Sequence, residues 1–267
     1  MSSQDQYCDI DGCRLRYRED GTGEAVALVH GWPHDLDMWE PQVAQLADHF
    51  RVVRFDRRGF GLSSGRPSLE ADVDDLLTLL DRLRIARAAV VGMSQGVRVA
   101  LQVALLAPQR VSVLVLDGAP TLDGSDIASE LPLSHYRELL NTQGIGAFRR
   151  EYRTHPFARL VTDDRHAHAI LDQVLARYPA RDLREGRPNA VIPATSSLGT
   201  LRTPTLVLTG ELDTPARQRA GAALHAFLPL AERATIPAAG HMANLDNPAA
   251  YNEAVLQFLQ RQFLAAA

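Results

Sequence analysis

The sequence predicts an α/β protein with a doubly wound, mostly parallel sheet and a helical cap inserted after the sixth strand. Short runs rich in Val and Leu alternate with longer stretches of helical periodicity, which is typical of a sheet covered by helices on both faces. The runs are apolar on both faces, as are strands buried in a parallel sheet. The alternation lapses between about Pro120 and Gly199, where the pattern becomes helical and amphipathic.

The first two strands expected form an antiparallel hairpin at the edge of the sheet. They are Tyr7–Ile10 and Arg14–Arg18, and the Asp11-Gly12 pair between them is typical of a two-residue turn. The apolar runs that follow are expected to be buried strands. These runs are Val26–His30, Val52–Phe55, Ala88–Gly92, Val111–Leu116, Thr205–Thr209 and Ala234–Ile236.

The helices are predicted from apolar residues that repeat every three or four positions. Leu69–Leu83 and Val97–Leu105 show this pattern in the core, and Pro108 ends the second helix. Asn247-Pro248 opens a C-terminal helix, because proline is tolerated in the first turn. The helices expected in the cap are His135–Leu140, Ile145–Tyr152 and Asp164–Arg177.

These patterns divide the chain into a core, residues 1–119 and 200–267, and a cap, residues 120–199. The cap carries ten Arg and ten acidic residues, so it is neutral overall. Its arginines are therefore interpreted as solvated residues rather than as an anion site.

Composition excludes several classes of function. With a net charge of −4 and a pI near 6.1, the chain gives no support to nucleic-acid binding. No stretch approaches the roughly 20 apolar residues that cross a bilayer. Residues 1–11 lack the features of a signal peptide, and Cys8 and Cys13 fit neither a disulfide framework nor a metal site. A cytoplasmic location is expected, since free thiols suit a reducing compartment.

The strongest local motif is Gly92-Met93-Ser94-Gln95-Gly96, which follows a buried strand and precedes a helix. This G-x-S-x-G pattern is typical of a nucleophile on a tight turn between a strand and a helix. Such a turn places the serine hydroxyl at the carboxyl edge of the sheet, where α/β proteins bind ligands. The alternative for Ser94 is an ordinary helix N-cap.

A serine nucleophile needs a general base, and the base needs a partner that fixes its tautomer. Asp213 and His241 follow the strands Thr205–Thr209 and Ala234–Ile236, so both are expected at the same edge of the sheet as the serine. The chain order Ser, Asp, His is the one that this motif predicts. Ser94, Asp213 and His241 are therefore predicted to form a catalytic triad.

Other residues compete for these roles. Asp117, at the end of the strand after the serine helix, and Glu211 are alternatives for the acid. Asp246 follows the histidine but is expected to cap the last helix. His166 and His168 suggest a metal pair, but positions i and i+2 point to different sides of a helix, so both are expected at the surface. No metal ligand is predicted.

Acyl transfer also needs N–H donors for the developing oxyanion. The backbone N–H of Gln95, at the start of its helix, is one candidate. The second lies in His30-Gly31-Trp32-Pro33, where Trp32 is the natural donor because Pro33 has no N–H. The Trp32 side chain is expected to pack beneath the cap.

Taken together, the motifs resemble those of the α/β-hydrolase fold over essentially the full chain. The matching stretches are Leu28–Pro33, Phe55–Ser63, the serine motif, Thr209–Asp213 and Gly240–Met242. Three stretches resemble bacterial aryl esterases and cofactor-free haloperoxidases or perhydrolases, namely His30–Pro33, Met38-Trp39 and Asp56–Gly61. Residues 240–248 resemble 3-oxoadipate enol-lactonases. Both branches imply a serine hydrolase without metal or organic cofactor. The residue after the serine is usually Met or another apolar residue in these groups, and here it is Gln.

The resemblance implies cleavage of a small carboxylic ester or lactone through an acyl-enzyme on Ser94, with His241 as general base and acid and Asp213 orienting it. Gly31–Asp35 also resembles a loop of cofactor-free dioxygenases of heteroaromatic compounds, in which His34 would anchor the substrate. A ligand sensor with an intact triad is the other open alternative. The partner expected is the small substrate, without nucleic acid or membrane, and a homo-oligomer is left open.

Two further expectations concern the reaction. Haloalkane dehalogenases and epoxide hydrolases need a carboxylate nucleophile, which Ser94 rules against. In esterases and perhydrolases that share the Trp32-Pro33 pair, a carbonyl of this loop can hold the incoming nucleophile. The resemblance therefore implies that hydrogen peroxide competes with water for the acyl-enzyme.

Overall fold

The computed structural model describes residues 4–121, 130–185 and 195–266, so the cap residues 122–129 and 186–194 lie outside the described residues. The described strands form one eight-stranded sheet in the order β1-β2-β4-β3-β5-β6-β7-β8. Pairing is parallel from β4 to β8 and antiparallel at β1–β2 and β2–β4, which confirms the mostly parallel sheet. The strands are β1 (Gln6–Ile10), β2 (Cys13–Asp20), β3 (Ala25–Val29), β4 (Arg51–Phe55), β5 (Ala88–Met93), β6 (Val111–Asp117), β7 (Thr205–Gly210) and β8 (Ala231–Ile236).

The predicted hairpin forms the β1 edge of the sheet. Ile10 pairs with Cys13, so two residues make the turn. Asp11 and Gly12 have φ angles of 44° and 70°, the left-handed values that such a turn requires.

The opposite edge differs from the prediction. β8 begins at Ala231 rather than Ala234, and Glu232, Arg233 and Thr235 are exposed. An edge strand pairs with one neighbour only, so its residues need not be apolar on both faces. The apolar pattern therefore revealed only the last three residues of this strand.

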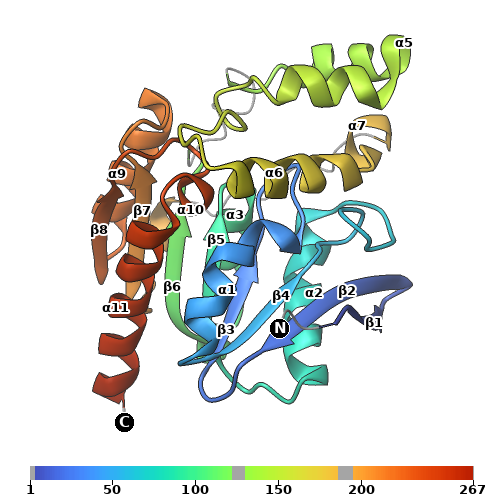
Figure 1. Ribbon diagram of the computed structural model, residues 1–267. Helices are drawn as coiled ribbons and strands as arrows, with labels where there is room; N and C mark the ends of the chain where they lie inside the picture. The colour runs from blue at the N-terminus through green and yellow to red at the C-terminus, as the bar shows by residue number, and fades with distance from the viewer. Residues whose placement is uncertain (1–3, 122–129, 186–194, 267) are drawn as a thin grey trace.

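Helices cover both faces of the sheet (Figure 1). The helices of the core are α1 (Glu40–Ala47), α2 (Leu69–Arg82), α3 (Gln95–Leu106), α9 (Pro215–Phe227), α10 (Ala243–Asp246) and α11 (Pro248–Ala266), with short 3₁₀ turns η1 (Leu36–Trp39) and η2 (Pro108–Arg110). Alternate residues of β3 enter two separate apolar clusters, one shared with α1 and α11 and the other with α2 and α3. This alternation follows from the two-residue period of a strand.

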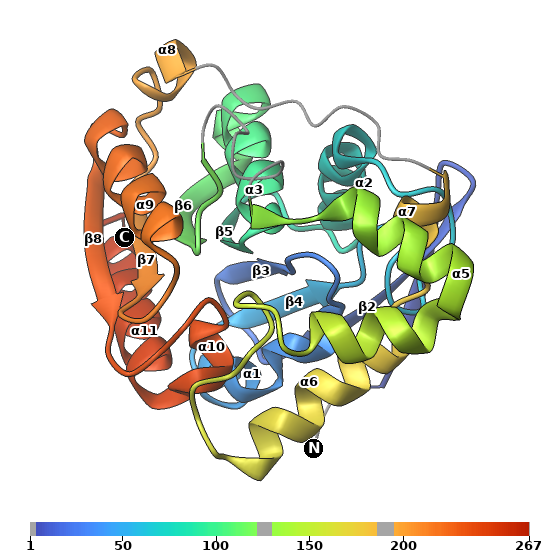
Figure 2. The ribbon, with the colours of Figure 1, turned by 90° about the horizontal axis from the view of Figure 1, so that it is seen from above.

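The helices expected in the cap lie between β6 and β7 in the chain. They are α5 (Leu133–Tyr152) and α6 (Arg165–Arg177), and the short helices α7 (Arg181–Glu185) and α8 (Thr195–Leu198), which were not predicted, follow them. The helices predicted at 135–140 and 145–152 are joined into α5, which is broken at Gly144 by a φ of 80°. Figure 2 shows α5 and α6 over the half of the sheet that contains β2, β4 and β3. The domain boundaries at 120 and 199 stay a prediction.

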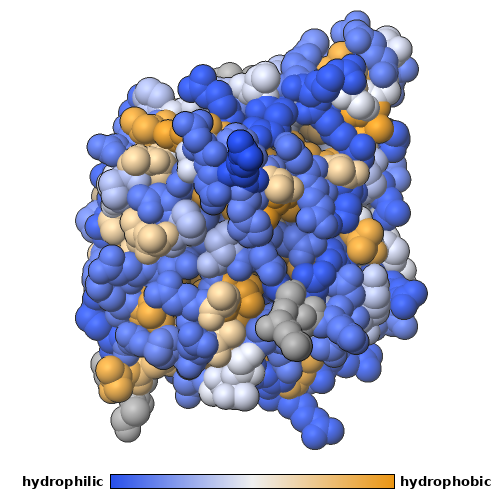
Figure 3. All heavy atoms as spheres, viewed as in Figure 1, coloured by the Kyte–Doolittle hydropathy of each residue, from blue (hydrophilic) through white to orange (hydrophobic). Residues whose placement is uncertain are grey.

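Among the described helices, none combines the length and the apolar composition that a bilayer span requires. In Figure 3 hydrophilic residues dominate the visible face, and apolar residues lie in small separate patches. Isolated surface apolar residues of this kind are ordinary.

Candidate active site

Ser94 lies on a sharp turn between β5 and α3. Its φ of 51° and ψ of −113° are unusual for a residue other than glycine. A Cβ on Gly92 would lie 2.5 Å from the Gly96 carbonyl oxygen, and one on Gly96 would lie 2.2 Å from the Val29 carbonyl oxygen. The two glycines are therefore required by close backbone contacts. Within the described residues, the Ser94 hydroxyl makes no capping bond to α3, so it is not an ordinary N-cap.

The structure brings Ser94, His241 and Asp213 together from three loops. The Ser94 Oγ lies 3.1 Å from His241 Nε2, and His241 Nδ1 lies 2.9 Å from Asp213 Oδ2. The other oxygen of Asp213 accepts a 2.7 Å hydrogen bond from the Thr214 N–H, which fixes the carboxylate. All three side chains are buried. A Cβ on Gly118 would lie 2.9 Å from His241 Cε1, so the imidazole packs directly on that backbone.

The competing acids occupy different positions. Glu211 accepts a hydrogen bond from the Ala238 N–H and so supports the loop before the histidine. Asp117 is buried, and neither of its carboxyl oxygens has a partner among the described residues. Burial and the nearby charge of Asp213 raise the pKa of Asp117 well above its usual value. Burial therefore favours the protonated form of Asp117, and the acid bonded to His241 is Asp213.

The prediction for Asp246 was wrong. Its carboxylate accepts hydrogen bonds from the backbone N–H groups of Gly240, Val161 and Thr162 rather than capping the last helix. The residue that caps α11 is Asn247, whose Oδ1 accepts from the Ala250 N–H at 3.2 Å. Adjacent Asp and Asn residues before a proline fit the capping pattern equally well, so the sequence did not separate them.

The Trp32 side chain packs beneath the cap, as expected. The rings around it are Tyr136, Phe148, Tyr152 and Tyr178, with centroids 5.1–6.4 Å from the indole. The indole Nε1 donates a 2.7 Å hydrogen bond to Asp182 Oδ2, a cap carboxylate. The Trp32–Pro33 peptide bond is cis, and the Trp32 carbonyl accepts a 3.3 Å bond from the Tyr152 hydroxyl. The assignment of the Trp32 and Gln95 amides to the oxyanion stays a prediction, as does perhydrolysis.

The Gln95 side chain is oriented by an arginine that sequence reasoning missed. Arg57 Nη2 donates a 2.7 Å hydrogen bond to Gln95 Oε1, and Arg57 Nη1 pairs with Asp72 at 2.9 Å. Because an arginine has only donors, the amide oxygen of Gln95 faces it and the NH₂ group faces away. Arg57 belongs to the Phe55–Ser63 stretch, but the residues of that stretch do not indicate that Arg57 would contact Gln95.

His34 is buried near the triad. Its side chain is 1% exposed, and neither ring nitrogen has a partner among the described residues. Burial lowers the pKa of His34 to about 3, and the charges of His241 and Arg57 act in the same direction. The ring is therefore neutral at physiological pH and presents one donor and one acceptor.

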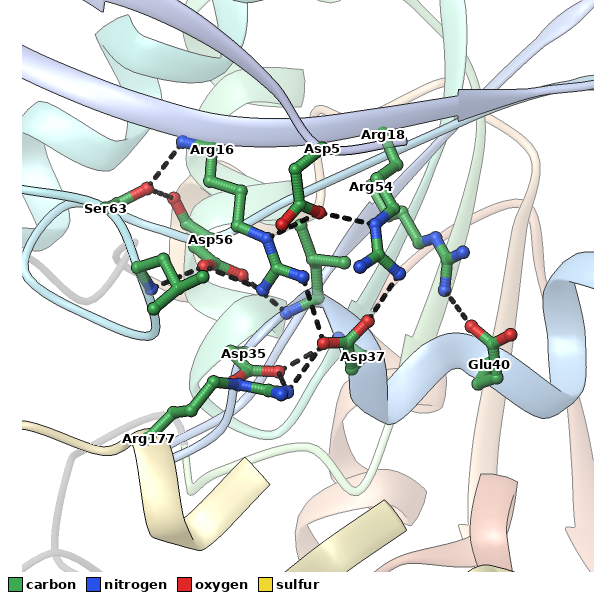
Figure 4. A network of polar contacts seen from close by, with 12 residues as sticks. Asp5, Arg16, Arg18, Asp35, Asp37, Glu40, Arg54, Asp56, Ser63 and Arg177 are labelled. Atoms are coloured by element: carbon green, nitrogen blue, oxygen red, sulfur yellow. Dashed lines mark hydrogen bonds and ion pairs between the residues drawn. The ribbon is translucent and has the colours of Figure 1, made fainter. Parts of the chain in front are cut away.

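The residues after His34 tie the core to the cap through a network of charges (Figure 4). Arg177 of α6 pairs with Asp35 at 2.7 Å and with Asp37 at 2.6 Å. Arg16 of β2 pairs with Asp37 at 3.1 Å and with Asp56 at 3.4 Å. Burial and the neighbouring Asp35 raise the pKa of Asp56 to about 7, against the opposing effect of Arg16. The interpretation of the cap arginines as solvated is therefore wrong for Arg177.

The two histidines considered as a metal pair differ from each other. His166 is exposed, whereas His168 is half-buried and bonds the Thr162 carbonyl through Nε2 at 2.9 Å. Its Nδ1 faces the guanidinium of Arg153. The surface position was therefore predicted correctly for His166 only. Over residues 4–121, 130–185 and 195–266, no three His, Cys, Asp or Glu side chains are grouped as a metal ion would require.

Known proteins resemble this chain in sequence and in fold. A family model described as alpha/beta hydrolase fold matches residues 24–142. A protein of Yersinia enterocolitica assigned as the carbamate hydrolase RutD is 31% identical over 249 residues, which cover 88% of this chain and 87% of that protein. The chain is a member of the α/β-hydrolase family. The predicted fold and the predicted resemblance are confirmed.

Solved structures of other members of this family resemble the chain over nearly its whole length. The enol-lactonase from Burkholderia xenovorans LB400 matches with a TM-score of 0.81 and 25% identity, covering 96% of this chain and 100% of that one. A thermophilic esterase from Thermogutta terrifontis matches with a TM-score of 0.78 and 26% identity, covering 97% and 99%. The chain spans only 31% and 54% of the length of the first two curated relatives that it matches.

Proposed function

We propose that this hydrolase cleaves a small carboxylic ester or lactone through an acyl-enzyme on Ser94. The observation that carries the proposal is the unbroken hydrogen-bonded chain from the Ser94 hydroxyl through His241 to Asp213, at 3.1 and 2.9 Å. In this arrangement the hydroxyl donates to Nε2, and Nδ1–H donates to the carboxylate. That tautomer leaves Nε2 free to accept the serine proton.

The reaction follows from this chain of groups. Ser94 Oγ attacks the carbonyl carbon while its proton passes to His241 Nε2, and the carbonyl oxygen gains negative charge. The backbone N–H groups of Gln95 and Trp32 are the proposed donors to that oxyanion. The C–O bond then breaks, His241 returns the proton to the leaving oxygen, and the acyl group stays on Ser94. A water molecule, deprotonated by His241, releases the acid and restores the serine.

Asp213 is proposed to orient His241 and to stabilise the imidazolium that forms. Its carboxylate is fixed by the Thr214 N–H as well as by the histidine, so the ring does not need to reorganise during the reaction. Preorganised groups of this kind lower the barrier because their alignment precedes the chemical step.

His34 is proposed to bind a polar group of the substrate. The His34 ring is 1% exposed, and within the described residues neither of its nitrogens has a hydrogen-bond partner. A substrate with a hydrogen-bond donor or acceptor of its own would satisfy them. The esterase and enol-lactonase likenesses support an ester or lactone, since a lactone is a cyclic ester. The likeness to a relative assigned as a carbamate hydrolase makes a carbamate the natural comparison substrate.

His34 also favours a second candidate, the cofactor-free dioxygenation of a heteroaromatic compound. In that reaction a buried neutral imidazole would hold the aromatic substrate, and the triad histidine would deprotonate it. Oxygen consumption that depends on His241 but not on Ser94 would favour dioxygenation. Turnover of an ester that depends on both residues favours hydrolysis over dioxygenation and over a sensor without turnover.

The test is a panel of p-nitrophenyl esters, small lactones and a carbamate, with the Ser94→Ala protein as blank. We expect hydrolysis of at least one short ester or lactone by the wild type and none above background by the variant. Equal rates for the two proteins would overturn the proposal. We also propose a cytoplasmic location, which the two free thiols of Cys8 and Cys13 support.

A further inference from the structure

The cap segment between α5 and α6 lies against the loop that carries His241. Phe157 in this segment packs on the imidazole, with ring centroids 4.3 Å apart and an angle of 32° between the planes. The guanidinium of Arg217, from α9, lies 4.5 Å from the centroid of the same phenyl ring. The histidine therefore has a cap residue, as well as core residues, in direct contact with its ring.

A single carboxylate joins the backbone of this cap segment to the histidine loop. Asp246 Oδ1 accepts from the N–H groups of Val161 and Thr162 at 2.6 and 3.1 Å. Its Oδ2 accepts from the N–H of Gly240 at 2.8 Å. Gly240 directly precedes His241, so this end of the bridge is attached to the residue next to the histidine.

The contact between the two loops is tight. A Cβ on Gly240 would lie 3.3 Å both from Asp246 Oδ2 and from Val161 Cγ2. Asp246 itself is buried, at 7% exposed, so its three hydrogen bonds are shielded from water. Hydrogen bonds to a shielded charged acceptor are stronger than those between neutral groups.

The cap segment has its own internal support. The N–H groups of Ala158 and Arg159 donate to the His155 carbonyl, both at 2.8 Å. The Thr162 carbonyl bonds the ring of His168 on α6 at 2.9 Å. These hydrogen bonds give the segment a defined conformation. A residue that packs against it, such as His241, is therefore held in a defined position.

We propose that the cap segment 155–162 positions His241, with Asp246 as the residue that couples the two loops. The inference rests on the proposed function, in which His241 moves a proton to and from Ser94. Asp246 does not reach the reacting atoms, so it is a positioning residue. The cap thereby supports the general base in addition to covering the substrate site.

An amide at position 246 tests this coupling with almost no change in volume. Asparagine offers one acceptor oxygen and one NH₂ group, whereas the three donors contact both oxygens of the aspartate. In Asp246→Asn the NH₂ group faces either Gly240 N–H or the cap amides, and that contact is lost. The variant therefore breaks the bridge between the two loops at one end, and the hydrogen bond or bonds at the other end remain.

The matched control is Asp164→Asn. Asp164 is an exposed aspartate that follows the same cap segment and caps α6 through the His166 N–H. Asparagine caps helices as well as aspartate does, so helix α6 is retained. Phe157→Leu is a second variant, which removes the ring from the imidazole and leaves the Asp246 bridge in place.

The experiment measures kcat and KM on the best ester, and the rate at which a fluorophosphonate labels Ser94. We expect Asp246→Asn and Phe157→Leu to lower kcat and the labelling rate by about 10- to 100-fold, with KM changed by less than about three-fold, because the loss is one of alignment. Asp164→Asn stays within about two-fold of wild type in both measurements. Thermal unfolding of each variant confirms that it is folded at the assay temperature.

The outcomes separate this inference from the proposed function. A wild type that is labelled at Ser94, with Asp246→Asn and Phe157→Leu equally fast, would overturn the positioning role alone. A loss confined to KM would also overturn it, since that pattern indicates weaker substrate binding. A wild type that is neither labelled nor active would overturn the proposed function, and this inference with it.

Discussion

Arg177 of cap helix α6 binds both carboxylate oxygens of Asp35, at 2.7 and 3.0 Å (Figure 4). The two residues are separated by 142 positions in the chain, and Asp35 directly follows His34. The paired contact fixes the direction of the arginine as well as its distance. The cap is therefore attached to the core at the base of the candidate substrate site.

Removing this arginine leaves a buried carboxylate unpaired. We expect Arg177→Met to lower the free energy of unfolding by about 3 kcal/mol, because breaking a buried ion pair strands the remaining charge. Urea unfolding followed by circular dichroism measures the change. Arg165→Met, at an exposed position of the same helix, is the control and is expected to stay within about 0.5 kcal/mol of wild type. An equal stability for the two variants would contradict the structural role of Arg177.

His34 is expected to lower the free energy of unfolding as the pH falls. Because the pKa of His34 is about 3 in the folded protein and about 6.5 in an unfolded chain, the unfolded state binds an extra proton between these values. Stability from this group is thus present above pH 6.5 and is lost as the pH falls toward 3. Between pH 7 and 5, wild type is expected to lose about 2 kcal/mol relative to His34→Gln.

The measurement for His34 is the difference in unfolding free energy between the two proteins at each pH. Taking the difference removes the opposing contributions of buried Asp56 and Asp72, whose raised pKa values favour the folded state at lower pH. A difference that does not change between pH 7 and 5 would show that the folded protein protonates His34 normally.

The local motifs indicated Ser94, Asp213 and His241, which the structure brings together, because each motif reflects a local requirement of the backbone. The glycines around Ser94 are needed within a few residues of the serine, and Asp213 and His241 each follow a strand directly. Such requirements are visible in a short stretch of sequence. The parallel strands were equally visible, since burial on both faces makes each of them a continuous apolar run.

The contacts between cap and core could not be predicted in the same way. Asp246 and Val161 are 85 residues apart, and the local sequence around Asp246 fits a helix cap. Arg57 and Gln95 meet only because β4 and β5 both flank β3 in the sheet. A charged residue is compatible with either solvent or a buried partner, and the choice depends on the whole fold.

Substitutions of Gln95 test the proposed main-chain donor to the oxyanion. Gln95→Met keeps the backbone N–H and a similar volume, so kcat is expected to stay within about five-fold of wild type. Gln95→Glu also keeps that N–H, and its carboxylate pairs with Arg57 in place of the amide oxygen, so kcat is expected to stay within about ten-fold of wild type. Steady-state kinetics on one ester measures both. A loss of about 100-fold or more in both variants would show that the side chain is required and would contradict a purely main-chain role.

Metal removal tests the expectation that the hydrolysis needs no metal. Incubation with EDTA followed by gel filtration is expected to leave kcat and KM for the best ester unchanged within error. The control is a known zinc hydrolase treated in the same way, which loses activity. Activity that disappears with EDTA and returns on adding one divalent metal would refute a metal-free mechanism.

The most direct test of Ser94 as the nucleophile is covalent labelling by a fluorophosphonate, read by peptide mass spectrometry. We predict a single adduct on Ser94, no adduct at that position in Ser94→Ala, and labelling slowed by about 10³-fold or more in His241→Ala. An adduct that persists on another residue in Ser94→Ala, or wild-type labelling rates in His241→Ala, would contradict this prediction.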